Sequence, residues 1–337
     1  MSGMNKRERV MAALRGQEVD APPVGFWGHD FMREWTAEGL AAAMLEQVRT
    51  YDYDYLKVNP RATYYAEAWG CRYRSANDPA KRPEVAHWVL REPADLESVR
   101  PVDSSAGPFG EQLEALRLIA EGLNGEVPFV QTVFSPLSVL GRMANDRELI
   151  QRWMTEAPDA LNAALAAVAE TLAAYARACL EIGADGIFFP TTEWGAADAC
   201  SAEQYEAFGR QYDLQVLAAA EGASFNILHV CRPHNIMDAL LDYPAAVVNW
   251  AVHDDGNATL ADAMKRTGMA MMGGVNEKET LMNGSVADVR AEVQEALRQT
   301  GGRRFLVAPG CSISPQTPPE HIHAAVAAAR EQGPREQ

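Results

Sequence analysis

Short apolar runs alternate with longer helical segments along this sequence, and this alternation limits the folds that the chain can adopt. Strands buried on both faces are typical of parallel sheets, which need a crossover helix between successive strands. We therefore predict an α/β fold in which eight parallel strands close into a (β/α)8 TIM barrel, with an open doubly wound sheet as the alternative. The eight runs lie at 23–28, 55–60, 128–135, 186–191, 225–231, 246–252, 269–275 and 304–310.

The segments between these runs carry helix signals and one long interruption. Three helices are predicted, over 159–180, over 205–220 behind a capping box at 201–204, and up to residue 330 behind a capping box at 317–320. The interval 61–127 is too long for one crossover and is rich in Pro, Trp and charge, so we expect an inserted lid or subdomain after the second strand. No repeat or linker divides the chain, and residues 1–337 are expected to form a single barrel domain.

Charge and cysteine usage exclude several classes of partner. The formal net charge of −16 repels phosphate backbones and anionic lipid headgroups, so nucleic acids and membrane surfaces are not expected as partners. The first residues lack the apolar segment of a secretory signal, and a cytoplasmic location is expected. The five cysteines are an odd and widely scattered set, which does not suit a disulfide framework.

One histidine and two cysteines stand at the ends of predicted strands. His229 and Cys231 close the fifth run, and Cys311 follows the eighth. In a barrel the carboxyl ends of the strands converge on one mouth, and residues two apart on a strand point to the same side. Three such ligands suit a catalytic Zn²⁺ with a fourth position left for substrate. The alternative is that each is a packing residue, because lone buried cysteines are more often small hydrophobes.

Motifs at the ends of six runs carry a resemblance to a known family. They read PLSVLGRM, GADGIFF, LHVCRPHNIMDAL, NWAVHDDG, MMGGVNEKETL and VAPGCSISPQTPPEHI, and they extend over most of the chain together with the opening RERVMAALRGQEVDAPPV. The sequence thereby resembles the uroporphyrinogen decarboxylase superfamily. Within it, His-x-Cys followed 80 positions later by the cysteine of Pro-Gly-Cys (311 − 231 = 80) resembles the zinc signature of the methylcobalamin:thiol methyltransferases, those acting on coenzyme M among them.

This resemblance implies a zinc-dependent methyltransferase that moves a methyl group between a corrinoid and a thiol or related acceptor. The decarboxylases place an Arg-rich loop after the first strand, whereas here residues 25–30 contain no arginine and the first is Arg33. An Asp-x-His-x-x-Gly corrinoid motif is not present, because His253 and Gly256 are preceded by Ala251. We therefore expect a corrinoid protein or free methylcobalamin to supply the methyl group.

Further candidates lie beyond other strand ends, although a solvated loop would look the same in the sequence. Glu193 is a candidate fourth zinc ligand with a catalytic role, and Trp194 beside it a candidate aromatic wall. The remaining substrate-contact candidates are His29, Asn59, His253 and Asn276. Three alternative functions stay open at this point: a decarboxylase that needs no metal, a zinc hydrolase that uses bound water, and a non-catalytic corrinoid-binding protein.

Overall fold

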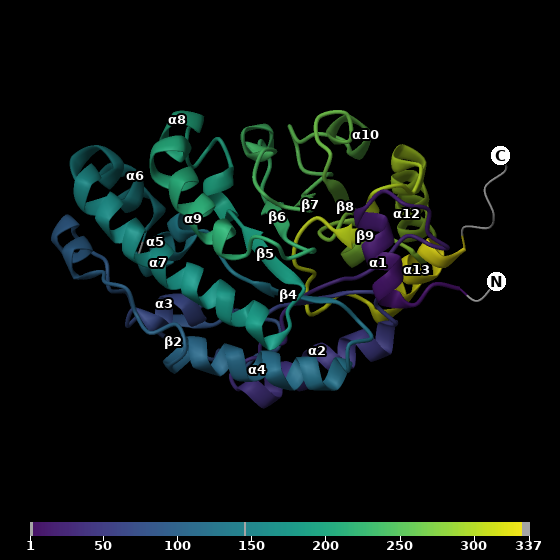
Figure 1. Cartoon of the computed structure of the whole chain (residues 1–337), viewed down its shortest axis with the longest axis horizontal. Helices are drawn as coiled ribbons and strands as arrows, with labels where there is room; N and C mark the ends of the chain where they lie inside the picture. Colours follow the sequence, from purple (N-terminus) through teal and green to yellow (C-terminus); the bar gives the residue numbers. More distant parts are fainter. Residues whose placement is uncertain (1–2, 145, 332–337) are drawn as a thin grey trace.

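A curled sheet of seven parallel strands forms the centre of the computed structural model, which describes residues 3–144 and 146–331 (Figure 1). Every residue of these strands is buried, as expected for a parallel sheet covered on both faces. Seven of the eight predicted runs thus form strands, and the α/β class is confirmed. In sheet order they are β1 (Leu56–Val58), β4 (Phe129–Thr132), β5 (Gly186–Pro190), β6 (Ile227–Val230), β7 (Val247–Trp250), β8 (Ala270–Val275) and β9 (Phe305–Pro309).

The predicted first strand at 23–28 is the exception, because it forms isolated bridges instead of a continuous ladder. Val24 pairs with Val307 of β9, and on its other side the Val24 carbonyl accepts a hydrogen bond from the Asp54 amide at 2.9 Å. The run begins with the second proline of a pair and contains two glycines, and both residue types weaken strand pairing. The segment therefore lies between β9 and the entry to β1, where the first strand of the barrel was expected, but it is not a regular strand.

Helices cover the outside of the curled sheet (Figure 1). The α-helices are α1 (Lys6–Leu14), α2 (Ala37–Tyr51), α3 (Tyr64–Ala68), α4 (Gly107–Leu123), α5 (Pro136–Met143), α6 (Arg147–Glu156), α7 (Pro158–Ile182), α8 (Ala202–Tyr205), α9 (Gln211–Ala219), α10 (Leu260–Ala263), α11 (Thr280–Asn283), α12 (Val286–Thr300) and α13 (Pro319–Arg330). Short 3₁₀ turns are η1 (Pro93–Ser98), η2 (Thr192–Gly195) and η4 (Met237–Leu240), and η3 (Glu206–Arg210) is a π-helical turn between α8 and α9.

The predicted helices are found, with one error in capping. Ser201 forms the predicted capping box, and the final helix ends at Arg330. The second capping box is wrong, because α13 begins one residue later than expected and Pro318 takes the N-cap position. The Thr317 hydroxyl is left without a hydrogen-bond partner. In the described part of the chain, α7 alone is long and apolar enough to cross a membrane, and 61% of its most apolar stretch is buried inside the fold.

The interval 61–127 divides into two parts. Helix α4 packs against α2 and α7 on the outside of the sheet, so it is a crossover helix and not part of a lid (Figure 1). The earlier part contains a two-stranded antiparallel hairpin of β2 (Arg72–Arg74) and β3 (Glu84–His87). Residues 72–88, which we call the hairpin region, are therefore the part that stays available for the predicted covering role.

A buried carboxylate lies in α9, away from the strand ends. The Asp213 side chain is completely buried and accepts hydrogen bonds from the Tyr205 and Tyr243 hydroxyls at 2.6 and 2.9 Å. Burial raises the pKa of Asp213 from 3.8 to about 7, against the opposing effect of these two hydroxyls and the Arg210 charge. The folded state thus holds this proton to a higher pH than the unfolded state.

This difference predicts a pH-dependent stability term that Asp213→Asn removes. As the pH rises from about 4 to about 7, the unfolded chain releases the Asp213 proton first, so wild-type stability falls across that window. The amide keeps both acceptor contacts without a charge. The Tm of Asp213→Asn minus that of the wild type should therefore increase by about 3–6 °C between pH 4 and pH 7. A Tm difference that stays constant across the window in thermal unfolding would contradict this.

Candidate active site

Strand ends bring His229, Cys231 and Cys311 together. His229 lies in β6, Cys231 directly follows that strand, and Cys311 follows β9 after the Pro309–Gly310 turn. Their ligand atoms lie within 4.8 Å of one another, with the His229 Nε2 3.1 Å from the Cys231 sulfur and 3.8 Å from the Cys311 sulfur. We call these three residues the HCC cluster. It is the arrangement that parallel strand ends predict.

A residue of the neighbouring strand determines which nitrogen of His229 faces the sulfurs. Asn249 of β7 pairs in register with His229, and its Oδ1 lies 2.5 Å from the imidazole Nδ1. The Asn249 amide nitrogen donates to the carbonyls of Met272 and Pro309 at 2.9 and 3.1 Å, which turns its oxygen toward His229. An amide oxygen only accepts, so Nδ1 carries the proton and Nε2 presents its lone pair to the cluster. This is the tautomer that binds a metal.

The two sulfurs have different proton affinities. The hydrogen bond between the Cys231 and Cys311 side chains lowers the pKa of Cys311 well below its usual value and raises that of Cys231, which burial raises further. Cys311 is therefore the sulfur of the pair that is more disposed to ionise. Behind Cys311, the buried Glu277 accepts a hydrogen bond from the Gly310 amide at 3.1 Å, and burial followed by the Cys311 charge raises the pKa of this carboxyl.

The HCC cluster lines a cavity of about 420 Å³, a size typical of small-molecule sites. One wall is aromatic: the Phe188 ring stacks on His229 with centroids 4.9 Å apart and meets Trp27 edge-on at 5.4 Å. The hairpin region closes another side of the cavity. It contributes Tyr73, Arg82, Pro83, Val85 and Trp88 to the lining.

Lys57 and Arg142 line the cavity and have no ion-pair partner among the described residues, and neither has the exposed Arg82 of the hairpin region. The Lys57 ammonium group donates to the neutral Asn59 amide and lies 4.7 Å from the centroid of the Phe188 ring. Burial lowers the pKa of Lys57 to about 7, although the cluster sulfurs and Glu34 oppose this. The Arg142 Nε is buried without a hydrogen-bond partner, and Tyr65 and then Glu193 raise the pKa of this guanidinium against the effect of burial.

The other sequence-predicted residues divide into two groups. Glu193, His29 and Asn59 line the cavity with the HCC cluster. Trp194, His253 and Asn276 do not. Trp194 is fully buried in a contact with α5, where a side chain at Gly141 would meet its ring at 2.7 Å. Trp27 and Phe188 supply the aromatic wall instead.

His253 and Asn276 make hydrogen bonds to backbone groups outside the cavity. His253 is exposed and its Nε2 lies 3.3 Å from the Gly274 carbonyl oxygen. Asn276 accepts hydrogen bonds from the Lys278 and Glu279 amides, both at 3.1 Å, and so stabilises the turn after β8. Lys57, Arg142, Asn249 and Glu277 are the cavity and support residues that the sequence did not indicate.

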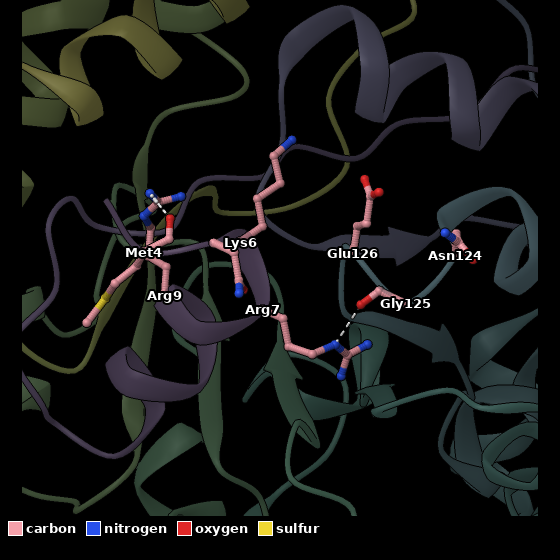
Figure 2. A pocket seen from close by; sticks show the side chains of 8 residues that line it. Met4, Lys6, Arg7, Arg9, Asn124, Gly125 and Glu126 are labelled. Atoms are coloured by element: carbon pink, nitrogen blue, oxygen red, sulfur yellow. Dashed lines mark hydrogen bonds between the residues drawn. The ribbon is translucent and has the colours of Figure 1, made fainter. Parts of the chain in front are cut away.

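A second cavity, of about 580 Å³, lies at the opposite ends of the strands (Figure 2). It contains several basic side chains of α1, but each is paired with a carboxylate: Lys6 with Asp52, Arg7 with Asp185, and Arg9 with Asp20 and Asp54. Arg7 also donates to the Gly125 carbonyl at 3.0 Å. These ion pairs join α1 to the end of α2 and to the loops that precede β1 and β5, so the basic side chains have a structural role.

Comparison with known proteins shows the family to which this chain belongs. The family model described as uroporphyrinogen decarboxylase (URO-D) matches residues 5–332. The chain belongs to the uroporphyrinogen decarboxylase family. This confirms the resemblance that the strand-end motifs carry.

The relatives of this chain are named for two different activities, methyl transfer and decarboxylation. It is 26% identical to the methylcobamide:CoM methyltransferase MtaA of Methanosarcina barkeri (strain Fusaro / DSM 804), over 98% of this chain and 99% of the relative. It is also 26% identical to the uroporphyrinogen decarboxylase of Alkalilimnicola ehrlichii, over 98% and 95% of the two chains. A solved methyltransferase from Methanosarcina mazei matches with a TM-score of 0.85 and 25% identity, over 97% of this chain and 99% of that one.

Proposed function

We propose that this protein transfers a methyl group from a corrinoid to a small thiol, with zinc held by His229, Cys231 and Cys311. The HCC cluster is the observation that carries the proposal. A decarboxylation that needs no metal does not require two sulfurs and an imidazole nitrogen close together at the cavity wall. The similarity to methylcobamide:CoM methyltransferases over the whole chain supports the same reaction class.

The donor set fits zinc on three grounds. Thiolate and imidazole ligands suit Zn²⁺, and three protein ligands leave a position for substrate. Asn249 presents the unprotonated Nε2 of His229, and Cys311 is already disposed to ionise. Zinc bound there would lower the pKa of a thiol that joins it and so supply a nucleophilic sulfur at neutral pH. Glu193, which lines the same cavity, is the proposed fourth ligand in the absence of that thiol.

The reaction balances without a further cofactor of this chain. The acceptor sulfur, after losing its proton, attacks the methyl carbon of a methylated Co(III) corrinoid. The carbon–sulfur bond forms as the cobalt–carbon bond breaks, and cobalt leaves with the electron pair as Co(I). The corrinoid, free or on a partner protein, is therefore a substrate. The hairpin region, as the part of the predicted insertion that lines the cavity, is proposed to limit access of water.

The cations without ion-pair partners indicate what kind of group the acceptor carries at the end away from its thiol. Lys57 and Arg142 stand in the cavity wall without carboxylate partners, in a chain of net charge −16. Such buried cations favour an anionic substituent, since pairing compensates their desolvation. A sulfonate thiol such as coenzyme M has this combination of groups.

A second candidate function deserves the same test. The same cations favour a carboxylate-bearing substrate and would suit a metal-free decarboxylase of this family. The two proposals differ in metal content and in product. Protein that contains no zinc as purified, does not gain methyl-transfer activity when zinc is added, and decarboxylates a carboxylated substrate would overturn the methyltransferase proposal.

Methyl transfer can be tested with three thiols that differ only in their terminal group. The zinc-loaded protein is mixed with methylcobalamin and 2-mercaptoethanesulfonate, 2-mercaptoethanol or 2-aminoethanethiol. Cob(I)alamin is followed by absorbance and the methyl thioether by mass spectrometry. We expect the anionic thiol to have the lowest KM. If none of the thiols is methylated, the proposed function is wrong.

Arg142→Leu tests the anion preference directly. Loss of a charge-assisted contact should raise the KM for the sulfonate thiol about 10–100-fold and leave the KM for 2-mercaptoethanol within about threefold of wild type. Arg117→Leu is the matched control, since Arg117 is exposed on α4 and pairs with Glu114 outside the cavity. Equal KM changes for both thiols would show that Arg142 does not recognise the anionic group.

A further inference from the structure

A histidine–carboxylate pair in the cavity has no role in the chemistry described above. The His29 Nδ1 lies 2.7 Å from the Glu34 Oε2, and the Glu34 side chain is completely buried, whereas His29 is 18% exposed. The His29 ring stacks on Phe31 at 5.0 Å with the planes 12° apart, which fixes its orientation. With its Nδ1 proton directed to the carboxylate, the ring keeps a lone pair on Nε2.

His29 shares the cavity with the HCC cluster. Both line the same 420 Å³ space. Gly28, the residue before His29, forms a parallel bridge with Ile313, two residues beyond Cys311. The Ile313 amide also donates to the Trp27 carbonyl at 2.9 Å. These backbone contacts attach the His29 segment to the segment that carries Cys311.

Two cationic side chains lie near this pair: Lys57, whose pKa the Glu34 charge raises against burial, and Arg61. Glu34 is the only carboxylate in contact with His29 in the described part of the chain, and one of its oxygens, Oε1, has no hydrogen-bond partner. Arg61 donates to the Glu34 backbone carbonyl, but its charge is paired with Glu67 and Glu111. A buried carboxylate behind the imidazole stabilises the imidazolium that forms when Nε2 takes a proton.

We propose that His29 is the general base that accepts the acceptor's thiol proton, and that Glu34 is its positioning residue. This inference rests on the proposed function. In the step, the S–H bond of the thiol breaks, its electron pair stays on sulfur, and the proton forms a new N–H bond at the His29 Nε2. After methyl transfer the imidazolium returns this proton to water.

Lys57 and Glu193 are less suited to this role. The Lys57 nitrogen already donates to Asn59 and lies over the faces of Trp27 and Phe188, and it is assigned above to the anionic end of the acceptor. Glu193 is proposed above to occupy the position that the thiol takes. His29 alone among the cavity-lining residues combines a free imidazole nitrogen with a buried carboxylate.

The test compares His29→Gln and Glu34→Gln with the control His323→Gln, an exposed histidine of α13. Zinc content should be equal in all three variants. At pH 7 we expect kcat/KM for the thiol to fall about 100-fold in His29→Gln and about tenfold in Glu34→Gln, with no change in the control. The His29→Gln deficit should shrink toward pH 10, where the thiol is already ionised. Added imidazole should restore part of its activity.

A second readout does not depend on turnover. In metal-free protein labelled with ¹⁵N-histidine, NMR should show His29 protonated at Nδ1 and unprotonated at Nε2, and Glu34→Gln should change this spectrum. A deficit that is equal at all pH values and is not relieved by imidazole would overturn the proposal, as would wild-type kinetics in His29→Gln. If the wild type itself methylates no thiol, the proposed function fails as well, and the two failures are thereby distinguished.

Discussion

Replacing Cys311 by alanine is expected to abolish both metal binding and methyl transfer. The wild type should contain about one zinc per chain, whereas the variant should retain less than about a tenth of that after dialysis. The reason is that Cys311 is the sulfur most disposed to ionise, and a site that has lost this thiolate holds zinc too weakly to survive dilution. The rate of methyl transfer to 2-mercaptoethanesulfonate should fall at least about 10³-fold.

Elemental analysis and the methylcobalamin assay measure the two effects separately. Cys71→Ala is the matched control, because Cys71 is also a free cysteine but lies in the hydrophobic core, with its sulfur 3.8 Å from the Met143 carbonyl. It should keep its zinc. The thermal unfolding of both variants is recorded, so that a folding defect is not mistaken for loss of a ligand. Equal zinc in wild type and a folded Cys311→Ala would refute the ligand assignment.

Replacing Asn249 by leucine is expected to weaken zinc binding by about 10–100-fold although Asn249 is not itself a proposed ligand. Leucine is close in size but cannot accept the His229 Nδ1 proton. The imidazole then loses the contact that selects the Nδ1–H tautomer and orients Nε2 toward the sulfurs. The carbonyls of Met272 and Pro309 lose their donor in the same variant.

The variant Asn249→Asp distinguishes the effect of Asn249 on the orientation of His229 from the effect of its hydrogen bonds to the two carbonyls. A carboxylate at this position accepts the same Nδ1 proton and should preserve zinc affinity better than leucine does, although it cannot donate to the two carbonyls. Competition with a chromogenic chelator gives the affinities. If both variants bind zinc as tightly as the wild type, the tautomer argument is wrong. If Asn249→Asp and Asn249→Leu weaken zinc binding equally, the loss is caused by the missing hydrogen bonds to the Met272 and Pro309 carbonyls.

The sequence by itself determined the order of the strands and the position of the candidate ligands. Runs of buried apolar residues set off by turn residues identify strands, and the parallel arrangement follows because helices separate them. Residues at the ends of such strands must converge, so the approach of Cys231 and Cys311 across 80 positions was predictable from their places in the pattern. The motifs of the same strand ends predicted the family.

Only the tertiary structure decided which other side chains share the cavity. Lys57 and Asn249 occur inside apolar runs, and no local pattern shows that one enters the cavity and the other supports His229, because both outcomes depend on register and curvature between strands. Trp194 follows a strand end, as Glu193 does, yet it turns into the core against Gly141. Strand ends are encoded locally, whereas the direction of each loop side chain depends on packing between segments far apart in the sequence.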